Sequence, residues 1–443
     1  MGALTTLIRQ ELAIAGGRPV RRAPFPPWPH FESGEIEAAA AVLRSGKVNY
    51  WTGREGVEFE REFAAFTGCM HAVAVANGTV ALELALYALG IGPGHEVIVP
   101  SRTFVASASC AVMRGATPVF ADVDVASQNI TAETIRPRLT RRTRAIVAVH
   151  LAGWPCDMDP IRELARAHGI NIIEDCAQAH GASDKGRPVG SLGDAAAFSF
   201  CQDKIISTGG EGGMLTTNDP AVWERAWSFK DHGKNYGAAH QRGSHTGFRR
   251  VHDSIGTNWR LTEMQSALGR ILLRKLPHSV AIRRRNAAIL AQSFAGIPAL
   301  RVTRPADCFG HAYYKYYAFV RPALLKPGWD RDRLAAAITA EGIPCSKGTC
   351  SEVYLEEAFP PEWRPPDRCP VARELGERSL MFLVHPTLSV ADMQDTCRAV
   401  EKVFEAALRH SPTFTRQRYS RPVTRSAPES ASQLTKRTNI LAS

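Results

Sequence analysis

Short apolar runs alternate with amphipathic stretches through the first half of this chain. Seven of these runs have the length and the Val, Ile, Ala and Phe content of buried strands, over residues 71–75, 96–100, 118–121, 145–151, 171–174, 195–200 and 213–217. Between them, residues 80–89 and 161–167 have the composition and spacing of helices. This order predicts an α/β fold whose mainly parallel seven-stranded sheet is covered by helices on both faces.

The pattern changes after about residue 286. Residues 313–320 alternate like a half-exposed strand, and residues 331–341 and 390–408 have helical periodicity. From residue 411 onward the chain is rich in Ser, Thr, Arg and Pro and has few large apolar residues. We therefore predict a large domain with an N-terminal arm over residues 1–285, a smaller C-terminal α+β domain over 286–410, and a disordered basic tail over 411–443.

The composition of the 443 residues, 44% hydrophobic and 22% charged, is typical of a globular protein and excludes disorder over most of the length. No apolar run approaches the roughly 20 residues that a membrane-spanning helix needs. Arg9 and Glu11 stand where a signal peptide would have its apolar centre. We expect a cytoplasmic protein without a membrane partner.

The 10 cysteines lie singly along the chain, without Cys-x-x-Cys pairs or Cys/His spacings suited to zinc. We expect reduced thiols and no metal site. The formal charge of +11 includes six Lys or Arg residues and one acidic residue between His410 and Ser443. Because the remaining basic residues form no recognisable nucleic-acid motif, we expect an anionic small-molecule substrate rather than a nucleic acid.

Three positions at the ends of predicted strands carry candidate chemistry. Gly78 and Thr79 follow the strand over 71–75 and begin a helix, where free backbone N–H groups and the helix dipole can hold a phosphate. The alternative is that Thr79 only caps the helix. Asp175 follows the strand over 171–174, at the edge where parallel sheets bind ligands, and a turn-forming or capping Asp is the alternative there.

Lys204 is the third candidate. It lies four residues beyond the strand over 195–200, beside the glycine-rich run 209–213, where a desolvated lysine can serve as an amine nucleophile. The alternatives are a solvated lysine and an ordinary glycine turn. A phosphate cradle, then a carboxylate, then a lysine is the order found in pyridoxal phosphate (PLP) enzymes of fold type I.

Six segments make this resemblance specific: 76–86 (ANGTVALELAL), 99–106 (VPSRTFVA), 149–161 (VHLAGWPCDMDPI), 173–182 (IEDCAQAHGA), 198–213 and 256–269 (GTNWRLTEMQSALG). In this order the chain resembles the DegT/StrS family of sugar aminotransferases over roughly residues 30–408. The resemblance implies a fold type I PLP-dependent enzyme, that is, a large α/β domain followed by a smaller one.

The family pattern also implies roles for individual residues. The lysine at the position of Lys204 forms the Schiff base with PLP, and the acid at Asp175 pairs with the pyridinium nitrogen, which makes the ring an electron sink. The remaining cofactor contacts are implied for Gly78, Thr79 and Ser199 (phosphate), Gln178 (phenolic oxygen), Phe104 (ring face) and Asn258 (phosphate of the neighbouring subunit). The last contact implies a homodimer with shared active sites.

By this resemblance the chain would transfer an amino group from L-glutamate to the keto group of a nucleotide-linked sugar, with Lys204 moving the proton. Residues 342–359 and 382–388 resemble a subgroup found with polysaccharide genes, which favours lipopolysaccharide or O-antigen synthesis. Three alternatives share the fold: a PLP-dependent sugar dehydratase, in which a histidine replaces the lysine, an amino-acid lyase or decarboxylase, and a PLP-binding regulatory protein that has lost catalysis.

Some positions depart from the family pattern. Cys201 stands where the family often has histidine, and Arg102 and Ala152 replace other side chains expected near the sugar. Arg249, Arg250 and Arg260 flank the segment that would cross the dimer interface, and we expect some of this positive charge to face the diphosphate of the acceptor. The departures at Cys201, Arg102 and Ala152 affect the predicted acceptor pocket rather than the cofactor site.

Overall fold

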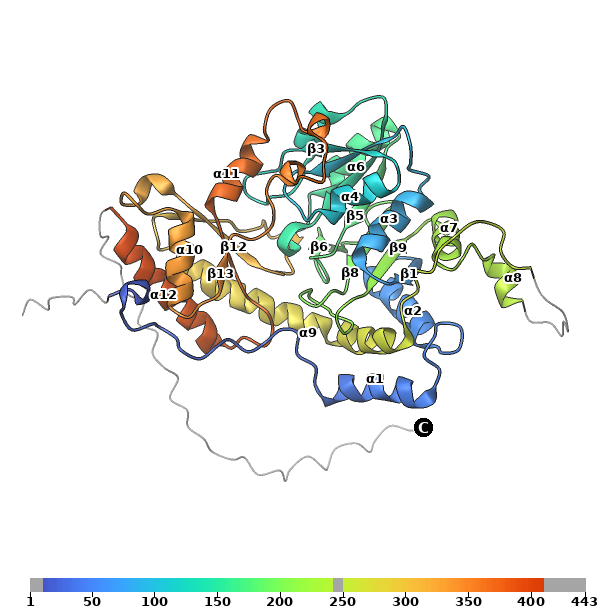
Figure 1. Ribbon diagram of the computed structural model, residues 1–443, viewed down its shortest axis with the longest axis horizontal. Coiled ribbons are helices and arrows are strands. Elements are labelled where there is room, and N and C mark those ends of the chain that lie inside the picture. Colours follow the sequence, from blue (N-terminus) through green and yellow to red (C-terminus); the bar gives the residue numbers. More distant parts are fainter. Residues whose placement is uncertain (1–10, 242–249, 410–443) are drawn as a thin grey trace, which may run out of the picture. The chain divides into compact units, whose positions relative to one another are not determined.

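A computed structural model describes residues 11–241 and 250–409, and these fall in one compact unit that ends at Arg409. Its largest element is a seven-stranded sheet of order β1-β9-β8-β5-β4-β2-β3. Only β9 runs against its neighbours, since β1 and β8 both pair with it antiparallel and the other pairings are parallel. The predicted mainly parallel seven-stranded sheet is thus confirmed, and Figure 1 shows its arrangement.

The strands of this sheet agree closely with the apolar runs in the sequence. They are β1 (His71–Val75), β2 (Glu96–Pro100), β3 (Thr117–Ala121), β4 (Thr143–Val149), β5 (Asn171–Asp175), β8 (Ala195–Ser199) and β9 (Gly213–Thr217). The helices of this region are α2 (Glu55–Thr67), α3 (Gly78–Ala88), α4 (Ala106–Met113), α5 (Ala132–Ile135), α6 (Met158–His168), α7 (Pro220–Lys230) and α8 (Tyr236–His240).

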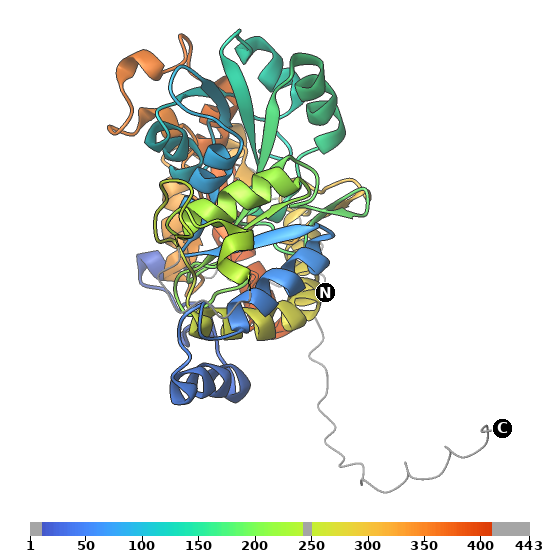
Figure 2. The same cartoon turned by 90° about the vertical axis from the view of Figure 1, so that its right-hand side faces the viewer.

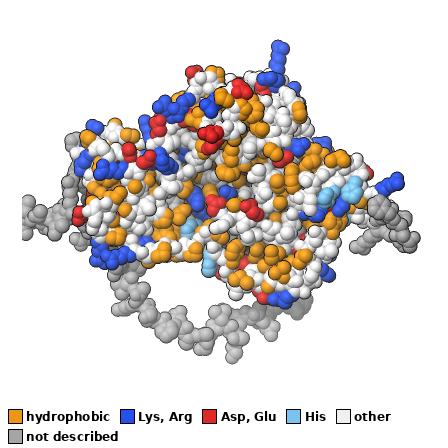
Figure 3. Space-filling view, in the orientation of Figure 1, with side chains coloured by type: hydrophobic (Ala, Val, Ile, Leu, Met, Phe, Trp, Pro, Cys, Tyr) orange, Lys and Arg blue, Asp and Glu red, His pale blue; other side chains and the backbone are white. Residues whose placement is uncertain are grey.

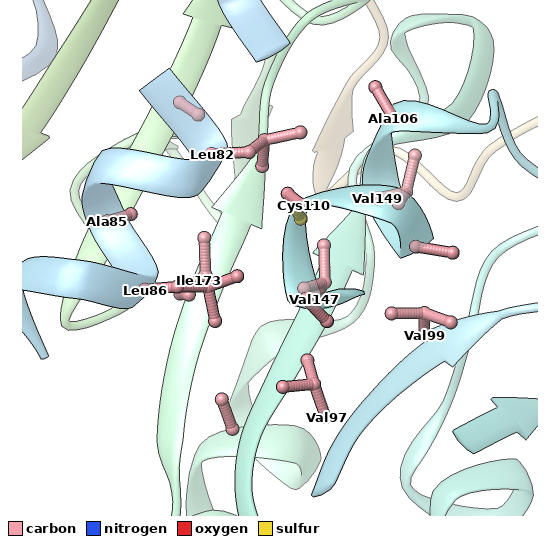
Figure 4. Packing of buried hydrophobic residues seen from close by; sticks show 14 of the residues in the cluster. Leu82, Ala85, Leu86, Val97, Val99, Ala106, Cys110, Val147, Val149 and Ile173 are labelled. Atoms are coloured by element: carbon pink, nitrogen blue, oxygen red, sulfur yellow. The ribbon is translucent and has the colours of Figure 1, made fainter. Parts of the chain in front are cut away.

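The core of the region lies between the sheet and these helices. In Figure 4, Leu82 and Leu86 of α3 and Cys110 of α4 face Val147 of β4 and Ile173 of β5. These side chains are almost wholly buried, and a buried Leu or Ile stabilises the fold by about 1.5–3 kcal/mol relative to an exposed one. Helix α3 is therefore fixed firmly to the sheet, which sets the position of its first turn.

Helix α9 (Glu263–Phe294) is the longest helix of the described residues and was not predicted. Thr262 caps its start, its side chain accepting from the backbone N–H of Gln265, and Pro277 lies inside it. It packs against α2 and against α1 (Ser33–Ser45), and the views in Figures 1 and 2 both show α1 on the side of α9 away from the large sheet. The predicted boundary at 285/286 falls inside α9, and the division into two domains stays a prediction.

The C-terminal region contains a four-stranded antiparallel sheet of order β10-β12-β14-β13, with strands Leu300–Val302, Tyr316–Val320, Ser379–Phe382 and Cys345–Ser346. Its helices are α10 (Arg331–Ala340), α11 (Pro370–Arg378) and α12 (Val390–Ala407). A third, three-stranded sheet joins β11 (Phe309–Gly310) to β6 (Ser183–Asp184) and β7 (Arg187–Pro188). The strand predicted over 313–320 begins only at Tyr316 and is buried along its whole length rather than half-exposed, and Tyr313, with a φ of 49°, lies outside it.

The N-terminal segment packs against this C-terminal region. The buried carboxylate of Glu341, at the end of α10, accepts hydrogen bonds from the backbone N–H groups of Ala13 (2.8 Å) and Val20 (3.0 Å). Lys402 of α12 pairs with the same carboxylate at 2.8 Å, and Arg21 pairs with Asp392 at 2.7 Å. The start and the end of the described chain are therefore joined by buried ionic contacts. The predicted basic tail, residues 411–443, lies outside the described residues.

Candidate active site

The candidate residues gather at one edge of the seven-stranded sheet. Because β1, β2, β4, β5 and β8 run in the same direction, their carboxyl ends meet there. Gly78 follows β1, Asp175 ends β5, and Ser199 ends β8 five residues before Lys204. Strand β9 begins at this edge too, since Gly213 pairs with both Val75 and Ser199. The sequence prediction of a single site at this edge is consistent with these positions.

The first turn of α3 forms a cradle for a small group. Asn77 caps the helix, its Oδ1 accepting from the N–H of Val80 at 3.0 Å, and Thr79 is exposed beside it. Gly78 lies so close to β8 that a Cβ added to it would stand 2.5 Å from the Cβ of Ser199. The sequence left open whether Thr79 caps the helix or helps to bind a phosphate. In the structure the side chain of Asn77, not that of Thr79, makes the capping hydrogen bond. Thr79 is thus free to contact an anion at the positive end of the helix.

Asp175 is buried and held from two sides. Its Oδ2 accepts from the hydroxyl of Ser107 at 2.7 Å, and its Oδ1 accepts from the N–H of Ala177 at 3.1 Å. Burial raises the pKa of Asp175, whereas the bonds from Ser107 and Ala177 and the charge of Lys204 act to lower it. Among the described residues no ion pair is formed by this carboxylate, and a protonated ring nitrogen would supply its positive partner. Sequence reasoning missed Ser107, one residue beyond the segment that carried the family resemblance.

Lys204 has a partly enclosed side chain, 19% exposed, at the same edge. Its Nζ lies 3.3 Å from Oδ1 of Asp203 and 5.2 Å from the ring centroid of Tyr314. The hydroxyl of Tyr314 donates to Asp203, and the indole N–H of Trp28 donates to the carbonyl oxygen of Lys204 at 2.9 Å. Sequence reasoning missed these three neighbours, because two of them come from distant segments and no local motif marks them.

Three further residues were predicted to contact the cofactor: Gln178, Phe104 and Asn258. Gln178 accepts through Oε1 from the N–H of Ala152 at 2.8 Å, which fixes its side chain beside the edge. Phe104 lies just before α4 and is 63% exposed, so its ring is free to cover a ligand. Asn258 is exposed, and its backbone bridges to that of Asp231. A role across a subunit interface needs such an exposed side chain.

The arginines expected to face an acceptor are placed differently from one another. Arg260 pairs within the chain with Asp231, which also binds Lys234 at 3.0 Å, and its contact with the diphosphate of an acceptor stays a prediction. Arg250 is exposed, and Arg249 lies outside the described residues. On the face drawn in Figure 3, basic side chains are interspersed with acidic ones rather than gathered in one patch.

His150, Glu174 and Cys176 form a buried group with the residue types of a metal site. His150 Nε2 lies 2.9 Å from Glu174, and its Nδ1 accepts from the N–H of Cys156 at 3.0 Å, so Nε2 carries the proton. Glu174 also accepts from backbone N–H groups, among them that of Leu192 at 2.7 Å. Hydrogen bonds thus account for the positions of His150 and Glu174, and the bonds of Glu174 hold the backbone just before β8.

A helix-end cradle, a buried acid and a primary amine at one sheet edge fit a phosphorylated pyridine aldehyde. The cradle suits its phosphate, Asp175 suits its ring nitrogen, and Lys204 suits its aldehyde. The fold and this site define the class of fold type I PLP-dependent enzymes. The chain belongs to the DegT/DnrJ/EryC1/StrS aminotransferase family, whose family model matches residues 29–401. The predicted family, fold class and cofactor, pyridoxal 5′-phosphate, are confirmed.

Individual relatives cover most of the chain. It is 38% identical over 354 residues to the GDP-perosamine synthase of Caulobacter vibrioides, across 79% of this chain and 90% of the relative. It is 37% identical over 340 residues to the L-glutamine:2-deoxy-scyllo-inosose aminotransferase of Streptomyces kanamyceticus, across 75% of this chain and 79% of the relative. A solved aminotransferase from Psychrobacter cryohalolentis is similar with a TM-score of 0.85 and 52% identity, over 86% of this chain and 99% of that one.

None of the helices within residues 11–241 and 250–409 is long and apolar enough to cross a membrane.

Proposed function

We propose that this aminotransferase moves an amino group from L-glutamate to the keto group of a nucleotide-linked sugar. The observation that carries the proposal is the convergence of Lys204, Asp175 and the Gly78 cradle at one sheet edge, in a chain of this family. The relative from Caulobacter vibrioides supports the substrate class, because its name specifies a sugar joined to GDP.

Different residues at this edge of the sheet would contact different parts of the cofactor. Backbone N–H groups at Gly78 and Thr79 and the hydroxyl of Ser199 bind the phosphate, and Gln178 donates from its amide nitrogen to the phenolic oxygen. Phe104 covers the ring. When bound, PLP supplies an electron sink for the carbon that loses its proton. Asp175 supports that chemistry by accepting a hydrogen bond from the ring nitrogen and keeping it protonated.

Lys204 would act as the proton carrier. Its Nζ would take a proton from the α-carbon of the amino donor in the first half-reaction and would deliver a proton to the sugar carbon that receives the amino group in the second. Asp203 at 3.3 Å and the Tyr314 ring hold this amine in place while it is free. Since the same atom works in both half-reactions, one lysine serves donor and acceptor in turn.

We further propose a homodimer in the cytoplasm, in which Asn258 of one subunit reaches the phosphate site of the other. The exposure of Asn258 supports this arrangement. Light scattering that gives the mass of one chain would contradict it. We assign the product to lipopolysaccharide or O-antigen synthesis on the resemblance of residues 342–359 and 382–388. The test is loss of one amino sugar from the cell-surface polysaccharide when the gene is deleted.

The main experiment separates the proposal from its alternatives. The purified holoenzyme is mixed with L-glutamate, and conversion of the cofactor to its amine form is followed by the loss of visible absorbance. The amine form is then given nucleotide-linked keto sugars, and mass spectrometry detects an aminated product. A binding protein would show no conversion, and a dehydratase would release water from the sugar without adding an amino group to it.

A second set of substrates tests the acceptor class. The relative from Streptomyces kanamyceticus is named for L-glutamine and 2-deoxy-scyllo-inosose, so both compounds are run in parallel. Amination of the inosose in preference to every nucleotide-linked sugar would overturn the proposed acceptor while leaving the aminotransferase chemistry intact.

A further inference from the structure

The backbone of Lys204 is held by a residue of the N-terminal segment. The indole N–H of Trp28 donates to the carbonyl oxygen of Lys204 at 2.9 Å. The Trp28 ring is itself packed between two side chains: its centroid lies 6.0 Å from that of His385, and the guanidinium carbon of Arg283 lies over the ring at 5.2 Å. A guanidinium is attracted to the face of an indole. The position of Trp28 therefore depends on Arg283 and His385.

The amine of Lys204 is held separately, by the carboxylate of Asp203. Oδ1 of Asp203 lies 3.3 Å from Nζ of Lys204. The hydroxyl of Tyr314 donates to the other oxygen of this carboxylate. Because a hydrogen bond to a carboxylate is strong, Tyr314 fixes the place where Asp203 holds the amine.

Arg283 of α9 connects these two supports. Its guanidinium covers the ring of Trp28, and its Nη1 donates to the carbonyl oxygen of Tyr314 at 3.2 Å. The contacts form a closed path that starts at the carbonyl oxygen of Lys204 and returns to its amine. The members of this path, in order, are Lys204, Trp28, Arg283, Tyr314, Asp203 and again Lys204.

Arg283 is an expensive residue to place in the core. Its side chain is 1% exposed, and its Nε and Nη2 are buried without a hydrogen-bond partner in the described part of the chain. Burial lowers the pKa of Arg283, and the charge of Asp203, the acid beside the Lys204 amine, acts to raise it. Since an apolar side chain fills a buried position without this cost, a guanidinium here indicates a role other than stability.

We propose that Arg283 is a positioning residue for Lys204. Through Trp28 it fixes the backbone of the lysine, and through Tyr314 and Asp203 it fixes the place of the amine. The proposal rests on the proposed function, in which this amine bonds to the cofactor and carries the proton. Since a misplacement of about 1 Å can slow a reaction roughly 100-fold, loss of Arg283 should slow the reaction. Because Arg283 is buried, the affinity for glutamate should change little.

Cofactor binding gives a test that does not depend on turnover. Full-length protein freed of cofactor is titrated with PLP, whose aldehyde bonds to the lysine, and with pyridoxamine phosphate, which has no aldehyde. Arg283→Met removes the guanidinium and keeps an unbranched apolar side chain. Arg301→Met is the matched control, because Arg301 likewise lies over an aromatic ring (Phe319, 4.2 Å) and donates to a backbone carbonyl oxygen (Val125, 3.0 Å).

We expect Arg283→Met to bind PLP roughly tenfold more weakly than the wild type, with its affinity for pyridoxamine phosphate within about threefold of the wild-type value. General damage to the site would weaken both ligands equally, and that result would overturn the proposal. An unchanged affinity for PLP, or the same selective loss in Arg301→Met, would overturn it as well.

The holoenzyme gives the second readout. Rapid mixing with L-glutamate yields the limiting rate of cofactor conversion, expressed per bound cofactor, and the glutamate concentration for half of that rate. We expect Arg283→Met to lower the limiting rate roughly tenfold or more, with the half-saturating concentration within about threefold of the wild type. A higher half-saturating concentration at an unchanged limiting rate would instead assign Arg283 to substrate binding and would overturn the proposal.

Two milder variants decide the matter if Arg283→Met does not fold. Trp28→Phe removes the indole donor and Tyr314→Phe removes the hydroxyl, and each keeps an aromatic ring. Each should lower the limiting rate by roughly fivefold, the equivalent of one hydrogen bond of about 1 kcal/mol. Limiting rates equal to that of the wild type in both variants would overturn the proposal.

Where Arg283→Met does fold, Trp28→Phe is also made in that background. Its further effect should be small, because the support that Arg283 gives through Trp28 is already lost. The same effect in both backgrounds would show that the two residues act independently and would contradict the path between them. Failure of the proposed function is recognised separately, because the wild type itself would then not convert glutamate.

Discussion

The hydroxyl of Ser107 donates a 2.7 Å hydrogen bond to Oδ2 of Asp175 and thereby joins the first turn of α4 to the end of β5. Ser107 is held in turn by Thr103, whose hydroxyl lies 2.8 Å from its own. The acid proposed to pair with the cofactor ring is thus oriented by a neighbouring element and not only by its own strand. Because hydrogen bonds to an ionised carboxylate are strong, this contact favours the charged form that the chemistry requires.

Replacing Ser107 with alanine tests this orientation. Ser107→Ala removes a bond that lowers the pKa of Asp175, so more of the acid is protonated and its pairing with a ring nitrogen weakens. We expect cofactor affinity to fall roughly tenfold, as one hydrogen bond to a charged group implies. The measurement is a titration of cofactor-free protein with PLP, followed by absorbance. Ser109→Ala, on the same helix, is the matched control, and equal affinities for the two variants would contradict the role of Ser107.

The proton carrier is tested at Lys204. Lys204→Ala removes the amine, and we expect the glutamate half-reaction to slow by roughly 10²–10⁴-fold, the usual contribution of a positioned acid–base group. The visible absorbance of the cofactor bound to the lysine should disappear as well. Lys234→Ala, which removes another partly buried lysine, serves as the control. A Lys204→Ala protein that still converts glutamate and keeps this absorbance would show that another residue holds the cofactor.

The close approach of Gly78 to β8 is tested by adding a methyl group at this position. Gly78→Ala places a Cβ 2.5 Å from the Cβ of Ser199, which two packed elements cannot accommodate without moving apart. We expect a loss of about 1–3 kcal/mol in the free energy of unfolding and weaker cofactor binding. Urea denaturation with and without PLP measures both effects. Gly34→Ala is the control, because a Cβ there meets no atom within 4 Å. An unchanged stability for Gly78→Ala would contradict the close approach of α3 to β8.

Much of the large sheet could be predicted because its strands are buried on both faces and read as apolar runs. The runs at 71–75, 96–100 and 213–217 coincide with β1, β2 and β9. Helix α9 was missed because it is partly exposed, carries many Lys and Arg residues, and contains Pro277, which usually ends a helix. Tertiary packing against α1, α2 and α12 stabilises it instead, and no local pattern reports such packing.

The sequence could predict those residues of the candidate site whose positions follow from the order and direction of the strands. Asp175 and Lys204 follow parallel strands, so the sequence alone places them at one edge. The residues that contact them come from elsewhere: Trp28 is 176 positions from Lys204, and Tyr314 is 111 from Asp203. Such partners depend on how distant segments dock, and single side chains of this kind have no spacing that identifies them.

The contact between the indole of Trp28 and the carbonyl of Lys204 has a practical consequence for anyone producing this enzyme. Residues 11–32, which precede α1, contain no strand, yet their backbone donates to Glu341 and the indole of Trp28 donates to the carbonyl oxygen of Lys204. A version trimmed to begin at α1 would remove the two backbone donors to Glu341 and the side-chain donor to the carbonyl oxygen of Lys204. Purification tags are therefore better followed by the intact leading segment than fused close to Trp28.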